Sequence, residues 1–121
     1  RPPKSTLFPY TTLFRSMKSI LREVVEKGTA RKANVKEVTV SGKTGTAQKI
    51  DKSGGYSQSE YIAVFVGFAP SEKPIFCAIV MVDTPKGIHS GGGVCAPIVG
   101  TILRNCVLHQ QWVKDKSVRP F

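Results

Sequence analysis

Two apolar runs in the middle of the chain constrain the fold most strongly. Residues 61–70 read YIAVFVGFAP and residues 74–83 read PIFCAIVMVD, so both alternating sets of side chains are apolar in each run. This pattern is typical of strands that are covered on both faces. Only residues 69–73 separate the runs, and a crossover to a parallel strand needs about a dozen residues or more. The sequence therefore predicts an antiparallel hairpin with both faces covered.

A helix and a further strand are predicted before the hairpin. Residues 17–27 carry four aliphatic side chains at helical spacing, and Gly28 supplies a helix stop. Those four side chains are Ile20, Leu21, Val24 and Val25. Val38 and Val40 then alternate toward Gly42, which predicts a strand that leads into a polar motif. Residues 49–59, rich in Lys, Ser and Gly, are expected to form a loop.

A second helix is predicted after the hairpin. Three glycines, 91–93, precede an apolar stripe that repeats every four residues and consists of Val94, Ile98, Ile102 and Cys106. We expect this helix to fray past His109. The order of helix, three strands and helix predicts an α+β fold, in which an antiparallel sheet is packed with an N-terminal and a C-terminal helix.

The two ends of the chain are interpreted as separate from this unit. Residues 6–16, TLFPYTTLFRS, resemble one reading frame of a common sequencing-adapter oligonucleotide, which implies that residues 1–16 are an artefactual leader. The alternative is a short β-prone leader with a turn at Pro9. Residues 17–111 then form the folded portion, and residues 112–121 a basic tail.

The charge balance gives little support to a nucleic-acid function. The formal charge is +10, but residues 17–111 contain 12 basic and 7 acidic side chains. These charges are scattered and lack the interleaved aromatic residues of a single-strand binding groove. We therefore expect a basic, solvated surface and no nucleic-acid partner. No run of 18 apolar residues is present to span a membrane.

No metal or cofactor is expected from the cysteines and histidines. Cys77, Cys95 and Cys106 form an odd set without a C-x-x-C pair, and neither histidine has ligand spacing to them. The simpler interpretation is that the three cysteines are small, buried, apolar side chains.

The motif VSGKTGTAQK, residues 40–49, allows two interpretations. A phosphate-binding loop ending in Gly42-Lys43-Thr44 requires glycine at position 37, which is glutamate here. The helix that must follow such a loop is also incompatible with Gly45. The alternative places Lys43, Thr44, Gly45 and Thr46 on a strand, where residues i and i+2 share a face. An ammonium and two hydroxyls would together suit a carboxylate, and an extended peptide could pair with the strand edge.

The segment SGKTGTAQ, residues 41–48, resembles the third active-site motif of the penicillin-recognising serine enzymes, whose signatures are S-x-x-K, S-x-N and K-T-G. The later segments YIAVFVGFAP, IFCAIVMVDTP and SGGGVCAPIVGTIL resemble successive strands and the C-terminal helix of the transpeptidase domain in class B penicillin-binding proteins. The resemblance covers about residues 17–108 and implies a partial penicillin-binding, β-lactamase-like transpeptidase fold.

The resemblance implies a chemistry and roles for four residues. In the family, a serine attacks the penultimate D-alanine carbonyl of a peptidoglycan stem peptide, D-alanine leaves, and an amine captures the acyl group; β-lactams acylate the same serine. Lys43 would polarise the proton-transfer network and attract the terminal carboxylate. The hydroxyls of Thr44 and Thr46 would bind that carboxylate. The Thr46 backbone N–H would donate to the oxyanion, and Gly45 would leave room for the substrate backbone.

The sequence departs from the family pattern in two respects. No serine is followed by lysine three residues later, and neither Asn34 nor Asn105 has serine two residues before it. The nucleophile and the second motif lie upstream in the family, so we expect this chain alone to be inactive.

Two other function classes stay open at this stage. One is a piece of a serine β-lactamase, which shares K-T-G, and the other is a small basic module that binds an anionic polymer. The resemblance implies stem peptides and β-lactams as ligands, and other cell-wall synthesis proteins as partners of the parent protein. It also implies a parent anchored in the bacterial inner membrane with this domain on its outer side. His89 is expected to be a solvent-exposed loop residue, and Tyr56 and Tyr61 could line a substrate groove.

Overall fold

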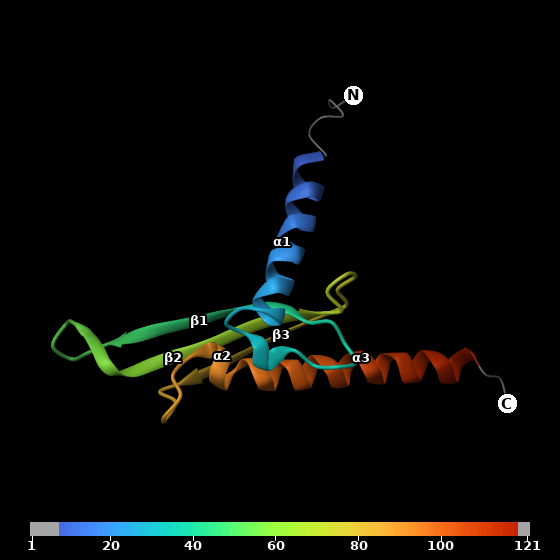
Figure 1. The fold of residues 1–121 in the computed structure, drawn as a ribbon. Coiled ribbons are helices and arrows are strands. Elements are labelled where there is room, and N and C mark those ends of the chain that lie inside the picture. Colours follow the sequence, from blue (N-terminus) through green and yellow to red (C-terminus); the bar gives the residue numbers. More distant parts are fainter. Residues whose placement is uncertain (1–7, 119–121) are drawn as a thin grey trace.

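The computed structural model describes residues 8–118, with side chains from residue 11 onward. Three antiparallel strands and flanking helices give the predicted α+β fold (Figure 1). The elements are α1 (Phe8–Glu26), the 3-10 helix η2 (Arg31–Ala33), β1 (Ser41–Ile50), β2 (Tyr56–Ala69), β3 (Phe76–Asp83), α2 (Gly91–Val94) and α3 (Ala96–Val118).

The sheet has the order β1-β2-β3, and both neighbouring pairs are antiparallel. The predicted hairpin is therefore confirmed as β2 and β3. The loop expected at residues 49–59 is shorter in the structure, because β1 continues to Ile50 and β2 begins at Tyr56. Its turn is closed by a 2.7 Å hydrogen bond from the Asp51 amide to the Gly55 carbonyl, and Gly54 adopts a φ of +88° that favours glycine.

Helix α1 ends where the sequence predicted but begins earlier. The Gly28 amide donates to the Val24 carbonyl at 3.1 Å, and a Cβ at Gly28 would lie 2.9 Å from that oxygen. The helix starts at Phe8 and so includes residues 8–16, where the alternative of a β-prone leader is wrong. Residues 1–7 lie outside the described part of the chain, and the adapter interpretation stays a prediction.

Helix α3 buries a different stripe from the predicted one. Ile98 and Ile102 are 43% and 40% exposed. The stripe that faces the protein consists of Ala96, Val99, Gly100, Leu103 and Val107. Small residues decide this orientation, since a Cβ at Gly100 would lie only 2.8 Å from the Ala33 carbonyl oxygen of η2. The helix also continues through residues 112–118, beyond the expected fraying point.

The core lies between one face of the sheet and α3, which runs along it (Figure 1). Phe65 is the largest fully buried side chain, and the ideal Cβ position of Gly67 lies 3.1 Å from Val99 of α3. The other face is open, since Ile79 and Met81 are each 63% exposed. Both-sided cover was predicted from the apolar runs, and the described residues supply it on one face only.

One ion pair connects the segment before β1 to α3. The guanidinium of Arg104 donates to both Glu37 carboxylate oxygens, at 2.7 and 2.8 Å. These hydrogen bonds lower the pKa of Glu37 to about 2. Among the described helices, none is long and apolar enough to cross a bilayer.

Candidate functional site

The Lys43–Thr46 motif lies in the interior of β1, which is one of the two edge strands of the sheet in the described part of the chain. This confirms the strand interpretation and excludes a phosphate loop, because β1 continues past the motif to Ile50 where such a loop requires a helix. Lys43, Gly45 and Thr46 are exposed and Thr44 is half-buried. The motif is therefore accessible from solvent.

The cross-strand register assigns each motif side chain to a face of the sheet. Thr44 and Thr46 lie opposite the buried residues Phe65 and Ala63, so the two hydroxyls share the face that packs against the helices, as predicted. Lys43 lies opposite Val66 and therefore starts from the open face. Its Nζ reaches the Thr44 carbonyl oxygen at 2.9 Å. The ammonium thus approaches the motif from the face opposite to the hydroxyls.

The hydroxyl of Thr46 is held by the start of α2. The Gly91 amide donates to Thr46 Oγ1 at 3.3 Å. A Cβ at Gly91 would collide with the carbonyl oxygens of Val64 and Gly45, so only glycine lets α2 lie directly on these strands. Because Thr46 Oγ1 accepts this bond, its own proton remains available to an acceptor such as a carboxylate.

The hydroxyl of Thr44 has a different partner. Thr44 Oγ1 lies 3.1 Å from Thr29 Oγ1, in the segment that follows α1. Thr29 was not singled out from the sequence, where a lone threonine after Gly28 gives no signal. Gly91 was seen only as part of the approach to the last helix. The geometry therefore adds one hydroxyl and one amide to the predicted motif.

Gly45 has open space in the direction that a side chain would take. A Cβ at this position would meet only the Val64 Cβ, at 3.7 Å, which is an ordinary contact. At Gly42, in contrast, a Cβ would lie 2.5 Å from the Phe65 ring, so the packing itself requires glycine there. Packing within the chain does not account for Gly45, which leaves the room that an approaching ligand backbone would need.

The two tyrosines considered as groove residues lie at different places on the sheet. The Tyr61 ring lies 4.8 Å from the His89 ring, on the same face of the sheet as Thr46. His89 is exposed, as expected, and Tyr56 is 74% exposed near the hairpin tip. Within the described residues, no group of histidine, cysteine or acidic side chains could hold a metal ion.

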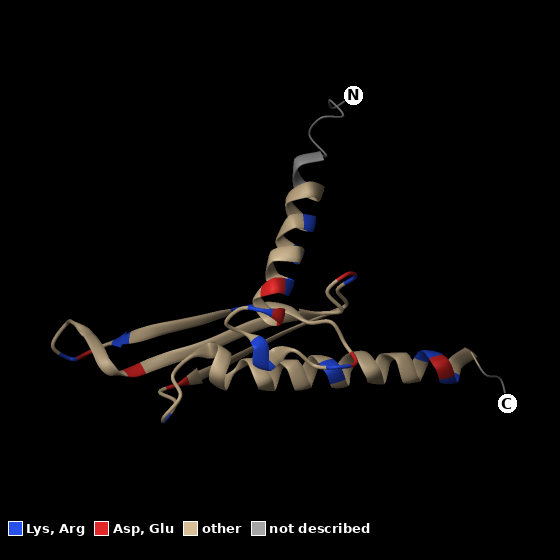
Figure 2. Ribbon diagram, viewed as in Figure 1, with Lys and Arg blue, Asp and Glu red and all other residues tan. Residues whose placement is uncertain are grey.

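Asp83 ends β3 and accepts a 2.9 Å hydrogen bond from Lys49 of β1. Its pKa is lowered by the Thr84 hydroxyl and then by Lys49. This ion pair reaches across the intervening strand β2 and lies outside the motif. Elsewhere, basic and acidic residues are interspersed along the chain (Figure 2).

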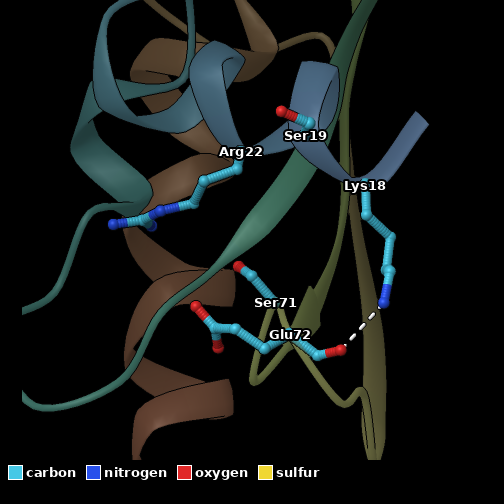
Figure 3. A pocket seen from close by; sticks show the side chains of 5 residues that line it. All are labelled: Lys18, Ser19, Arg22, Ser71 and Glu72. Carbon is cyan, nitrogen blue, oxygen red and sulfur yellow. Dashed lines mark hydrogen bonds between the residues drawn. The ribbon is translucent and has the colours of Figure 1, made fainter. Parts of the chain in front are cut away.

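A cavity of about 200 Å³ lies between α1 and the turn after β2 (Figure 3). Lys18, Ser19, Arg22, Ser71 and Glu72 line it. Lys18 Nζ donates to the Glu72 carbonyl at 2.8 Å, and the Glu72 carboxylate accepts from the Thr39 hydroxyl at 2.7 Å. The second bond is the main reason that the pKa of Glu72 is lowered. These two bonds connect the turn after β2 to α1 and to the segment before β1, and the cavity is lined by no residue of the motif.

Only one of the three cysteines is fully buried. Cys95 connects α2 to α3, and its Sγ donates to the Ala63 carbonyl at 3.3 Å. Burial raises the pKa of this thiol. Cys77 on β3 is exposed and Cys106 is partly exposed, so the interpretation as buried small side chains holds for Cys95 alone.

Comparison with known proteins gives a consistent result. Residues 11–104 match the family described as the penicillin binding protein transpeptidase domain. Stage V sporulation protein D of Bacillus subtilis (strain 168) is 48% identical over 92 residues, which cover 75% of this chain and 14% of that protein. Peptidoglycan D,D-transpeptidase FtsI of Escherichia coli (strain K12) is 34% identical over 103 residues, which cover 84% of this chain and 17% of that protein.

A solved structure agrees with these matches. Penicillin binding protein 3 from Mycobacterium tuberculosis, complexed with ampicillin, superposes with a TM-score of 0.65 at 28% identity. The match covers 88% of this chain and 24% of that one. The chain spans less than a fifth of the length of the two curated relatives described above.

Proposed function

This chain belongs to the penicillin-binding protein transpeptidase domain family, and from that premise we propose that it supplies the substrate-binding strand of a peptidoglycan D,D-transpeptidase. The observation that carries the proposal is the exposed edge strand, where Thr44 and Thr46 share one face and Gly45 has open space. A stem peptide could pair with this edge as a further strand.

The proposed reaction is acyl transfer through a serine that lies outside these 121 residues. The serine oxygen bonds to the penultimate D-alanine carbonyl carbon, and the terminal D-alanine leaves with a proton on its amine. An amine of a second stem peptide then takes the acyl group and returns the serine hydroxyl. The hydroxyls of Thr44 and Thr46 bind the terminal carboxylate during the first step. The Lys43 ammonium, which reaches around the strand from the opposite face, attracts this carboxylate and polarises the proton-transfer network. The Thr46 amide stabilises the oxyanion, a contribution worth about 10²–10³ in rate at other enzymes.

β-Lactams are proposed as ligands of the same site. The Mycobacterium tuberculosis relative was solved in complex with ampicillin, which supports this class of ligand. We also propose that the parent protein is anchored in the inner membrane of a bacterium, with this domain on the outer side and other cell-wall synthesis proteins as partners. The family resemblance supports that location.

The proposal is tested by covalent labelling of the intact transpeptidase that carries this sequence. Lys43→Ala should slow acylation by a fluorescent penicillin at least about tenfold, because it removes a charge-assisted contact to the carboxylate. Lys52→Ala is the matched control, since it removes an exposed lysine from the hairpin tip of the same sheet. Acylation of the Lys43 variant at the rate of the wild type would contradict the proposal.

The 121-residue chain alone should remain unlabelled, because it contains no S-x-x-K sequence. Mass spectrometry after incubation with a penicillin measures this directly. A penicilloyl adduct on any serine within residues 17–121 would show that the nucleophile had been assigned wrongly.

A further inference from the structure

Thr29 is the one hydroxyl outside the motif that contacts a motif hydroxyl among the described residues. It lies three residues after the end of α1, and its Oγ1 is 3.1 Å from Thr44 Oγ1. Both oxygens are accessible, because Thr29 is exposed and Thr44 is half-buried. The pair therefore lies at the edge of the proposed carboxylate site rather than inside the core.

The packing around Thr29 fixes its position. A Cβ at Gly92 would collide with the Thr29 carbonyl oxygen and lie 3.4 Å from Thr44 Cγ2. Glycine at position 92 thus lets α2, the Thr29 segment and β1 meet closely. Because this packing fixes the Thr29 backbone, its side chain loses little further freedom when a ligand binds.

The protons of the two hydroxyls can be counted. One proton lies between the two oxygens, and either hydroxyl can supply it. If Thr29 donates, the Thr44 proton is free to bind an anion. If Thr44 donates instead, its proton is already used, and Thr29 would compete with the ligand. The two arrangements predict opposite effects of removing the Thr29 hydroxyl.

We propose that Thr29 is a positioning residue that donates its hydroxyl proton to Thr44 Oγ1 and so directs the Thr44 proton toward the ligand carboxylate. The inference rests on the proposed function of Thr44. Together with the Gly91 amide at Thr46 Oγ1, Thr29 makes both motif hydroxyls donors to one anion. The ligand group recognised is then a carboxylate with two acceptor oxygens, and its neutral ester should lose most of this contribution.

The test compares benzylpenicillin with its methyl ester as acylating agents of the intact transpeptidase. Thr29→Val keeps the shape of the side chain and removes the hydroxyl. We expect it to slow acylation by the acid about threefold to tenfold, the range for loss of one neutral hydrogen bond, and to leave acylation by the ester within about twofold. Thr29→Ser should restore the rate with the acid. Thr101→Val, which removes a threonine hydroxyl bonded within α3, should change neither rate.

The outcomes separate the inference from the function on which it rests. An unchanged or faster reaction of Thr29→Val with the acid, or an equal loss with acid and ester, overturns the positioning role. If the wild-type protein itself fails to prefer the acid, and Lys43→Ala is harmless, the proposed carboxylate site is wrong. A wild-type preference for the acid combined with an insensitive Thr29→Val variant overturns the inference alone.

Discussion

Two adjacent residues of α3 allow a sharp test of how this helix packs. Leu103 is 1% exposed, whereas Ile102, which the sequence pattern placed in the buried stripe, is 40% exposed. Replacement by alanine removes three carbon atoms from the side chain at either position. The difference in cost between Leu103→Ala and Ile102→Ala therefore reports the orientation of the helix rather than the chemistry of the change.

The magnitudes follow from burial. At about 0.8 kcal/mol per buried methylene, removal of three carbons from Leu103 costs about 2.4 kcal/mol, and the cavity left against the sheet raises this to about 3 kcal/mol. At Ile102, partial exposure reduces the transfer cost to about 1.4 kcal/mol. The higher helix propensity of alanine offsets a few tenths, which leaves about 1 kcal/mol.

Urea denaturation of the 121-residue chain, followed by far-ultraviolet circular dichroism, measures both changes. We expect the free energy of unfolding to fall about 2 kcal/mol further for Leu103→Ala than for Ile102→Ala, with the denaturant slope unchanged. Thr101→Ala, at an exposed position of the same helix, controls for the effect of alanine on the helix itself. Equal losses at the two positions, or a larger loss at Ile102, would refute the orientation described here.

Two further predictions concern charge and thiol chemistry. The folded-state pKa of Glu37 is depressed to about 2 by Arg104, so its contribution to stability is present above the ordinary carboxyl pKa and is lost as pH falls from about 4.5 toward 2. Chemical denaturation across this range should show the loss, Glu37→Gln should reduce it, and an identical pH profile for the variant would contradict the prediction. Under native conditions a maleimide should modify Cys77 well before Cys95, which is buried with a raised pKa, and mass mapping that found Cys95 first would refute the packing of α2 on the sheet.

The strands were predictable because their signals are local. Alternation and a short connection sufficed for the hairpin, and Lys43 to Thr46 were placed on a strand because glycine at position 45 and glutamate at position 37 exclude the phosphate loop. The pairing of Thr44 with Thr46 on one face followed from strand geometry alone. The direction of approach of Lys43 did not, because a long flexible side chain can reach around the strand from either face.

The face of α3 was not predictable from spacing alone. Two apolar series each repeat every four residues along the helix, one through Ile98 and the other through Val99, so the spacing does not select between them. The structure buries the series that contains Val99, because the neighbouring small residues Ala96 and Gly100 let the helix backbone approach η2 closely. Periodicity counts apolar side chains, whereas packing also depends on how near two backbones can come, and the sequence does not specify the neighbouring backbone.

The same reasoning explains the contacts at the site. Thr29 and Gly91 are far from their partners in the sequence: Thr29 lies 15 residues before Thr44, and Gly91 lies 45 residues after Thr46. No local pattern reports such contacts. What the sequence does report is a run of three glycines, which is costly in a helix. The close approach of other backbones explains Gly91 and Gly92, whereas Gly93 lies against the Ile88 side chain.

One face of the sheet is less covered than its sequence predicts. The apolar runs of β2 and β3 predict cover on both faces, and the structure leaves Ile79 and Met81 exposed on one of them. A strand sequence records the environment in which the strand functions, whereas the described residues cover only one face of the sheet. Lys43 starts from this open face, so whatever covers it also determines the surroundings of the ammonium. Cys77 lies on the same face of β3 as Ile79 and Met81, so the reactivity of its thiol reports whether this face is covered. Its modification rate should fall in any state in which the face is covered.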